Sequence, residues 1–66
     1  MNVTDNTAKA EKIIANALKD FNVMNDQPPA YDVLLEMITT FLNNEQTQHA
    51  YTEANVYAMQ MEKAGF

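Results

Sequence analysis

Four residue types are missing from the 66-residue sequence: cysteine, serine, arginine and tryptophan. Without cysteine the chain cannot form a disulfide, a thiolate zinc site or an iron–sulfur cluster, which is typical of proteins in a reducing compartment. Without serine or cysteine it lacks the usual activated nucleophiles, and its single histidine, His49, has none to activate. We therefore expect a cytoplasmic, non-enzymatic protein that uses no cofactor.

Long hydrophobic runs are also missing. The most apolar stretch, residues 33–38, includes Glu36 and covers only about a third of a bilayer span. Residues 1–5 do not begin a signal peptide, because no basic segment precedes an apolar one. The sequence therefore predicts neither a transmembrane helix nor a signal peptide.

Glycine occurs only at position 65 and proline only at positions 28 and 29, so few residues interrupt regular structure. With 47% hydrophobic residues and a length below one typical domain, the chain is expected to fold as a single helical domain over residues 1–66. Its first helix is expected at about 5–22, with an N-cap from Thr4, Asp5, Asn6 or Thr7. The apolar residues there repeat every 3.6 positions: Ala10, Ile13, Ile14, Ala17, Leu18 and Phe21.

A second helix is expected at about 29–43, with the two prolines in its first turn, where the backbone N–H groups have no partner. Its apolar residues cover roughly 200° of the helix circumference at 100° per residue, which is wide for a surface helix. They are Ala30, Tyr31, Val33, Leu34, Leu35, Met37, Ile38, Phe41 and Leu42. Residues 43–47 then form a short connection with Asn or Thr as the next cap, or alternatively continue the helix.

A third helix is expected at about 46–64. Four alanines and two tyrosines share one of its faces, which favours close packing. Gly65 follows at the position where a left-handed residue ends a helix, and Phe66 could fold back on Met61. The sequence thus predicts an all-α, short three-helix unit, a helical hairpin preceded by an N-terminal helix.

The charges are unevenly distributed. Three of the four lysines, Lys9, Lys12 and Lys19, lie in the first helix, whereas residues 20–62 contain seven acidic residues and no lysine. This acidity argues against direct binding to nucleic acid, although three short helices are also the outline of a helix-turn-helix domain. It permits the alternative that the protein is an acidic inhibitor occupying a basic, nucleic-acid-binding surface of a partner.

Glu45, His49 and Glu53 are spaced four residues apart and could form a metal-binding stripe on one helix. Ligands spaced in this way rarely surround an ion, and a polar surface stripe is the better interpretation. Asp32 and Glu36 are likewise an ordinary solvent-exposed pair. We predict no metal site and no catalytic residues.

Two surfaces remain as candidates for binding. A chain of this size has a small core, so we expect a helical-bundle homodimer that self-associates through Val33, Met37 and Phe41 of the second helix. The third helix has a further face opposite its alanines, which we expect to bind a partner protein: His49, Thr52, Val56, Met59 and Lys63. The function expected from the sequence is a small protein-interaction or regulatory module.

Overall fold

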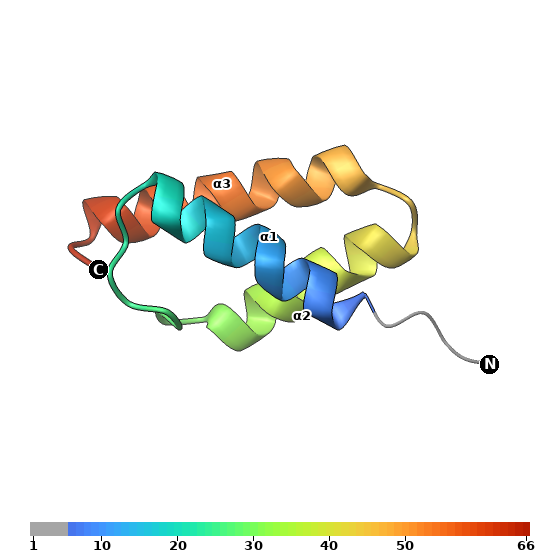
Figure 1. Cartoon of the computed structure of the whole chain (residues 1–66), viewed down its shortest axis with the longest axis horizontal. Helices are drawn as coiled ribbons and strands as arrows, with labels where there is room; N and C mark the ends of the chain where they lie inside the picture. The colour runs from blue at the N-terminus through green and yellow to red at the C-terminus, as the bar shows by residue number, and fades with distance from the viewer. Residues whose placement is uncertain (1–5) are drawn as a thin grey trace.

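The computed structural model describes residues 6–66, which form three α-helices and no β-strand. Helix α1 spans Thr7–Asp20, α2 spans Tyr31–Asn43 and α3 spans Thr47–Lys63. Helices α1 and α3 run in the same direction and α2 runs in the opposite one (Figure 1). The prediction of an all-α, three-helix unit is confirmed.

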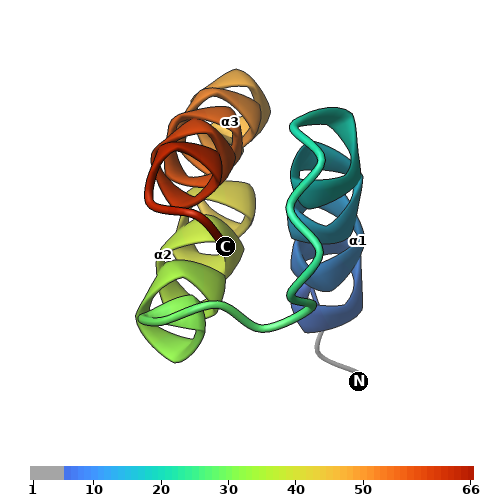
Figure 2. The same cartoon turned by 90° about the vertical axis from the view of Figure 1, so that its left-hand side faces the viewer.

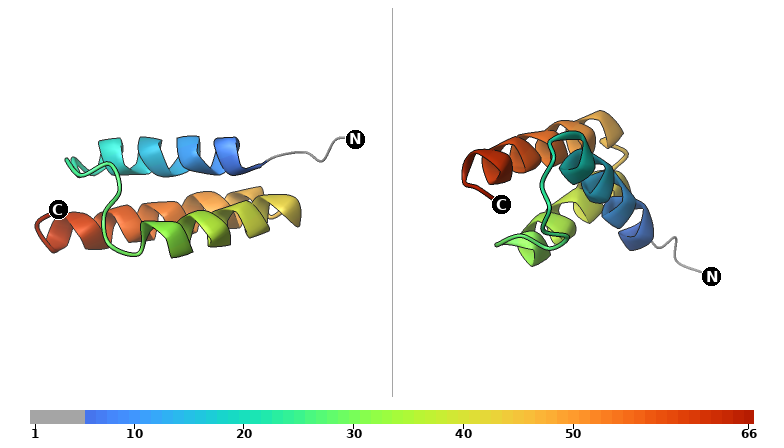
Figure 3. Two further views of the ribbon diagram at one scale, coloured as in Figure 1. Left: turned by 90° about the horizontal axis from the view of Figure 1, so that it is seen from below. Right: turned by 60° about the vertical axis from the view of Figure 1, so that its left-hand side comes forward.

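The helices pack in two layers. Seen nearly end-on, α2 and α3 lie together on one side and α1 on the other (Figure 2), and α1 forms a separate layer across the hairpin (Figure 3). Thirteen buried hydrophobic side chains fill the space between the layers, and five of them are alanines. They are Ala10, Ile13, Ile14, Ala17, Leu18, Val23, Leu34, Ile38, Leu42, Ala50, Ala54, Tyr57 and Ala58.

Helix α1 begins later than expected, at Thr7 with Asn6 at the N-cap. The Asn6 side chain makes no capping hydrogen bond; its Nδ2 donates instead to Oδ1 of Asn43 over 2.6 Å. This contact ties the start of α1 to the end of α2. Of the other expected capping candidates, Thr7 is the first residue of the helix, and Thr4 and Asp5 lie outside the described residues.

The expected placement of the two prolines in the first turn of α2 is wrong. Helix α2 begins at Tyr31, and the residue before it, Ala30, has a left-handed backbone with φ 66°. A residue before proline is disfavoured in the helical region, so Pro29 keeps Pro28 out of the helix. Pro28 is instead buried, and its carbonyl oxygen accepts a hydrogen bond from the Tyr31 N–H over 3.1 Å.

All three helices end with the same hydrogen-bonded arrangement, the Schellman motif. At the end of α3, the Gly65 N–H donates to the Glu62 carbonyl and the Phe66 N–H to the Met61 carbonyl, which confirms the left-handed position of Gly65. At the end of α1, the Asn22 N–H donates to the Lys19 carbonyl and the Val23 N–H to the Leu18 carbonyl. At the end of α2, the Glu45 N–H donates to the Leu42 carbonyl and the Gln46 N–H to the Phe41 carbonyl. The helix lengths are therefore fixed by local backbone geometry.

The connection between α2 and α3 is short and separates the two helices. Glu45 adopts a left-handed backbone with φ 60°, so a continuous helix through this segment is excluded. The N-cap of α3 is Gln46, without a side-chain hydrogen bond, rather than the expected Asn or Thr. Thr47 is already the first residue of the helix.

At the other end of the bundle, the Met24 N–H donates to the Phe66 carbonyl oxygen over 3.0 Å, which joins the α1–α2 connection to the residues after α3. Within residues 6–66, none of the helices combines the length and the hydrophobicity that crossing a membrane requires.

Candidate protein-interaction surface

The ring contact between Phe41 and His49 shows which side of α2 faces α3. The two ring centroids are 4.4 Å apart and the ring planes meet at 79°, an edge-to-face arrangement. Phe41 is partly buried and packs against the hydrophobic core, whereas His49 is exposed. This contact joins the last turn of α2 to the first turn of α3.

The residues that we predicted for self-association lie along this side of α2. At 100° per residue, Met37 and Val33 are within about 80° of Phe41 around the helix axis. Val33 is 63% exposed and Met37 is 38% exposed. Both are large apolar side chains that the described part of the chain leaves uncovered.

The residues that we predicted for partner binding are all exposed on α3. At 100° per residue they lie within about 80° of His49, on the side away from the alanines of the core. The side chains of Val56 and Met59 are 37% and 38% exposed, and Thr52 and Lys63 are exposed as well. The structure thus places these five residues on one face of α3.

The two predicted surfaces are joined by one contact. They meet where the ring of Phe41 contacts the ring of His49. Helix α1 packs near the other edge of α2, where Thr7 shares a surface cavity with Leu35 and Thr39. We call the two predicted surfaces together with Glu53 the outer hairpin face and define it as Val33, Met37, Phe41, His49, Thr52, Glu53, Val56, Met59 and Lys63.

Glu53 belongs to this surface although we did not predict it as a binding residue. Its Oε2 lies 3.9 Å from Nε2 of His49, and the two side chains are 37% and 55% exposed. The only signal in the sequence is its spacing of four residues after His49, which places the two side chains on one face of a helix. A polar contact this exposed contributes little to stability, so the Glu53 carboxylate remains available to a partner.

The α2–α3 hairpin and α1 differ in charge. Residues 31–63 contain five carboxylates (Asp32, Glu36, Glu45, Glu53 and Glu62) and one ammonium group, Lys63, a net charge of −4 with His49 neutral. Helix α1 carries Lys9, Lys12 and Lys19, all exposed. The hairpin is therefore an acidic surface with apolar residues on its outer face, and α1 provides most of the positive charge.

The possible metal-binding stripe is interrupted. Glu45 lies before the start of α3 in a left-handed backbone conformation, so it does not share a helix face with His49 and Glu53. Among the described residues, no group of three or more His, Asp or Glu side chains could hold a metal ion.

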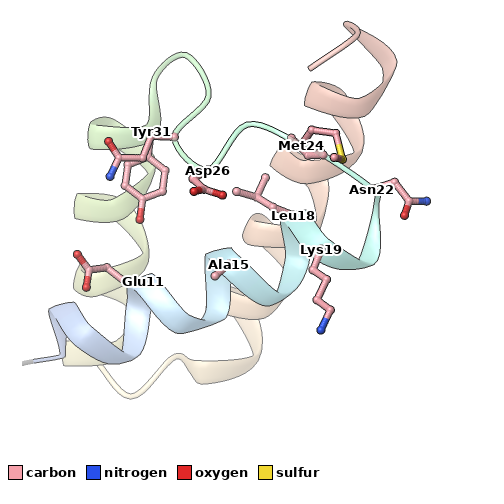
Figure 4. Close-up of a pocket in the computed structure, with 10 residues that line it drawn as sticks. Glu11, Ala15, Leu18, Lys19, Asn22, Met24, Asp26 and Tyr31 are labelled. Carbon is pink, nitrogen blue, oxygen red and sulfur yellow. The ribbon is translucent and has the colours of Figure 1, made fainter.

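A surface cavity of about 610 Å³ lies between α1 and the α1–α2 connection (Figure 4). The side chains of Glu11 and Tyr31 lie at one end of it, and Asp26 lies above Leu18. Burial, and then the charges of Glu11 and Asp32, raise the pKa of Tyr31 above its ordinary value of 10.0. A phenol with a raised pKa stays protonated at neutral pH and is a poor general base there.

The chain matches no protein-family model, and no similar curated protein or solved structure was found. Its function is therefore inferred from the outer hairpin face and from the charge around it.

Proposed function

We propose that this chain is a small, non-enzymatic protein-interaction module that self-associates and binds a partner protein through the outer hairpin face. The observation that supports this most strongly is the exposure of four large apolar side chains on the outer hairpin face: Val33, Met37, Val56 and Met59. Single exposed hydrophobic residues are common on soluble proteins, but contiguous apolar surfaces are characteristic of interaction sites.

The small size of the core supports self-association. Five of the thirteen buried hydrophobic residues are alanines, which bury little apolar area. Domains below about 70–80 residues gain only a few kcal/mol from one core, and this chain contains no cysteine for a disulfide. A second copy that covers the outer hairpin face would extend the apolar core across the two molecules.

A two-fold arrangement suits the order of residues on α2. In such an interface both copies use the same surface, and residues near the two-fold axis contact the identical residues of the second copy. Met37 lies between Val33 and Phe41 along the helix, so it falls near the middle of the surface. Its flexible side chain can adapt to packing against the Met37 side chain of the second copy.

Sedimentation at micromolar concentration tests self-association. The wild-type chain is expected as a dimer, and Met37→Lys is expected as a monomer because it places two ammonium groups in an apolar contact. Tyr51→Lys is the matched control, because Tyr51 is 48% exposed but lies about 160° from His49 around α3. A 7.5 kDa wild-type monomer would refute self-association.

The alternative function is that of an acidic inhibitor occupying a basic, nucleic-acid-binding surface of a partner. The net charge of −4 on the hairpin favours it, and so does the separation of this charge from the lysines of α1. Binding through charge weakens steeply with added salt, whereas binding through an apolar surface does not. The salt dependence of partner binding therefore distinguishes the two functions.

We propose a cytoplasmic location, since a chain without cysteine needs no oxidising compartment. We also propose that α3 does not bind nucleic acid directly, because Lys63 is its only lysine and it also carries Glu53 and Glu62.

A further inference from the structure

We infer that the connection between α1 and α2 is a strap that opens as a unit while the three helices stay packed, and that the carbonyl group of Phe66 is the latch that holds it closed. The strap consists of residues 22–30 and runs across one end of the bundle (Figure 2). Its two buried residues are Val23 and Pro28. Opening uncovers them and so gives the molecule a second apolar surface, which the closed state hides.

The strap has few buried contacts with α1. Seven of its nine residues are exposed, among them Met24, whose side chain is 87% exposed. Beneath it lies the surface cavity of about 610 Å³, where Asp26 of the strap lies above Leu18 of α1 (Figure 4). Segments with few buried apolar contacts open locally at a lower free energy than the core. The strap therefore opens more readily than the helices unfold.

Hydrogen bonds fasten the strap at two places. The Met24 N–H donates to the Phe66 carbonyl oxygen over 3.0 Å, and the Tyr57 hydroxyl donates to the Pro29 carbonyl oxygen over 3.0 Å. The end of α3 holds Phe66 in position, because the Phe66 N–H donates to the Met61 carbonyl oxygen over 2.9 Å. Neither fastening lies within a helix, so both break without the loss of a helical hydrogen bond.

The two ends of the strap provide its hinges. Asn22 and Ala30 both have left-handed backbones, with φ 61° and φ 66°. Asparagine tolerates this conformation, whereas alanine is strained in it because of its Cβ atom. Opening allows Ala30 to leave the left-handed region. The closed strap thus stores backbone strain, which the hydrogen bonds from Met24 and Tyr57 offset.

Hydrogen exchange of the Met24 amide, measured by NMR in low concentrations of urea, tests the inference. In the wild type its free energy of opening should stay constant as urea is added, because opening of the strap exposes little surface. The fully buried residues Ile14 and Ile38 should exchange through global unfolding, so their free energies of opening should fall linearly with urea. We expect the Met24 amide to be at least about tenfold less protected than these two.

Two variants change the closed strap in opposite directions. Removal of Gly65 and Phe66 deletes the acceptor and should raise the exchange rate of the Met24 amide by at least about tenfold. Ala30→Gly relieves the strained backbone and should lower that rate about threefold. If the shortened chain does not fold, Tyr57→Phe removes the other fastening and should raise the same rate about fivefold.

Glu45→Gly is the matched control. Glu45 also has a left-handed backbone, with φ 60°, but it lies between α2 and α3 at the other end of the bundle (Figure 1). Its conformation is the same whether the strap is open or closed. The variant should slow exchange of the Ile38 amide by about two- to fivefold through a gain in global stability, and leave exchange of the Met24 amide unchanged.

Three results would overturn independent opening or the latch. If the Met24 and Ile38 amides are equally protected and equally sensitive to urea, the connection opens only when the whole chain unfolds. Slowing of both amides by the same factor in Glu45→Gly has the same meaning. If the Met24 amide exchanges at the same rate with and without residues 65 and 66, Phe66 is not the latch.

Discussion

The hydroxyl of Tyr57 donates a hydrogen bond to the carbonyl oxygen of Pro29 over 3.0 Å, and the carbonyl oxygen of Pro28 lies 3.2 Å from the same hydroxyl. This contact joins the middle of α3 to the segment that connects α1 with α2. Neither proline carbonyl belongs to a helix, and Pro28 is buried, so the Tyr57 hydroxyl supplies hydrogen bonding that water cannot readily provide there. It holds the connection against the end of the hairpin.

Replacing Tyr57 by Phe tests this contact. The variant keeps the ring but loses the hydrogen bond, and we expect the free energy of unfolding to fall by about 1 kcal/mol. Urea denaturation followed by circular dichroism measures the change. Tyr51→Phe is the control, because the Tyr51 side chain is 48% exposed and its hydroxyl is accessible to water, so its stability should match that of the wild type. Equal stability of the two variants would show that the contact is not stabilising.

The same residue predicts how stability changes in alkaline solution. Burial, and then the nearby Tyr31, raise the pKa of Tyr57 above its ordinary value of 10.0. Below pH 10 the phenol is protonated in both states and its contribution to stability is complete. As the pH rises from 10 through the raised pKa, the unfolded chain loses its proton first, so stability falls.

Thermal unfolding measured between pH 8 and pH 11 checks this expectation. The unfolding temperature should begin to decrease near pH 10, and the decrease should be smaller in Tyr57→Phe. Tyr31 contributes in the same direction, since its pKa is also raised. If the unfolding temperature of Tyr57→Phe decreases as much as that of the wild type, Tyr57 does not contribute to the alkaline effect.

Glu45 should be replaceable by glycine with a gain in stability. Its backbone has φ 60°, a left-handed conformation that is unfavourable for a residue with a Cβ atom. We expect Glu45→Gly to raise the free energy of unfolding by about 0.5–1 kcal/mol. Glu45→Ala separates charge from conformation, because it removes the carboxylate and keeps the Cβ. Stabilisation by alanine as large as that by glycine would attribute the gain to charge.

Ile38 and Val33 lie on the same helix, but they should respond differently to truncation. Ile38 is fully buried, so Ile38→Ala is expected to lower the free energy of unfolding by about 2–5 kcal/mol. That loss is comparable to the whole stability of a small domain, and the variant is expected to be largely unfolded. Val33 is 63% exposed, so Val33→Ala should retain the helix content of the wild type by circular dichroism. A well-folded Ile38→Ala variant would contradict this account of the core.

The three helices could be predicted because their apolar residues repeat at the helical period. The end of α3 could be predicted because Gly65 readily adopts the left-handed backbone that ends a helix. The start of α2 could not be predicted from the two prolines alone. Proline tolerates the first turn of a helix, and only the contacts of the folded chain show that Pro28 accepts hydrogen bonds from Tyr57 and Tyr31 instead. Glu45 gave no signal, because glutamate seldom adopts a left-handed backbone.

The exposed residues of the outer hairpin face were predictable one helix at a time, but the contact that joins the two helices there was not. Apolar residues cover a wide arc of α2, so either edge of that arc could have faced α3. The Phe41–His49 contact and the position of Thr7 near Leu35 decide between the two edges, and both depend on how the helices pack. The relation between two surfaces on different helices is a property of the tertiary structure.

The three buried alanines of α3 restrict the substitutions that this helix can accept. Ala50, Ala54 and Ala58 are each 0% exposed and recur every four residues, so the neighbouring helices approach α3 at its smallest side chains. Exchange of one large aliphatic residue for another is usually tolerated in a core, whereas added volume at a close contact forces the backbones apart. In a library of single substitutions, these alanines should accept only glycine or serine, and α3 should prove as restrictive as α2 despite its smaller side chains.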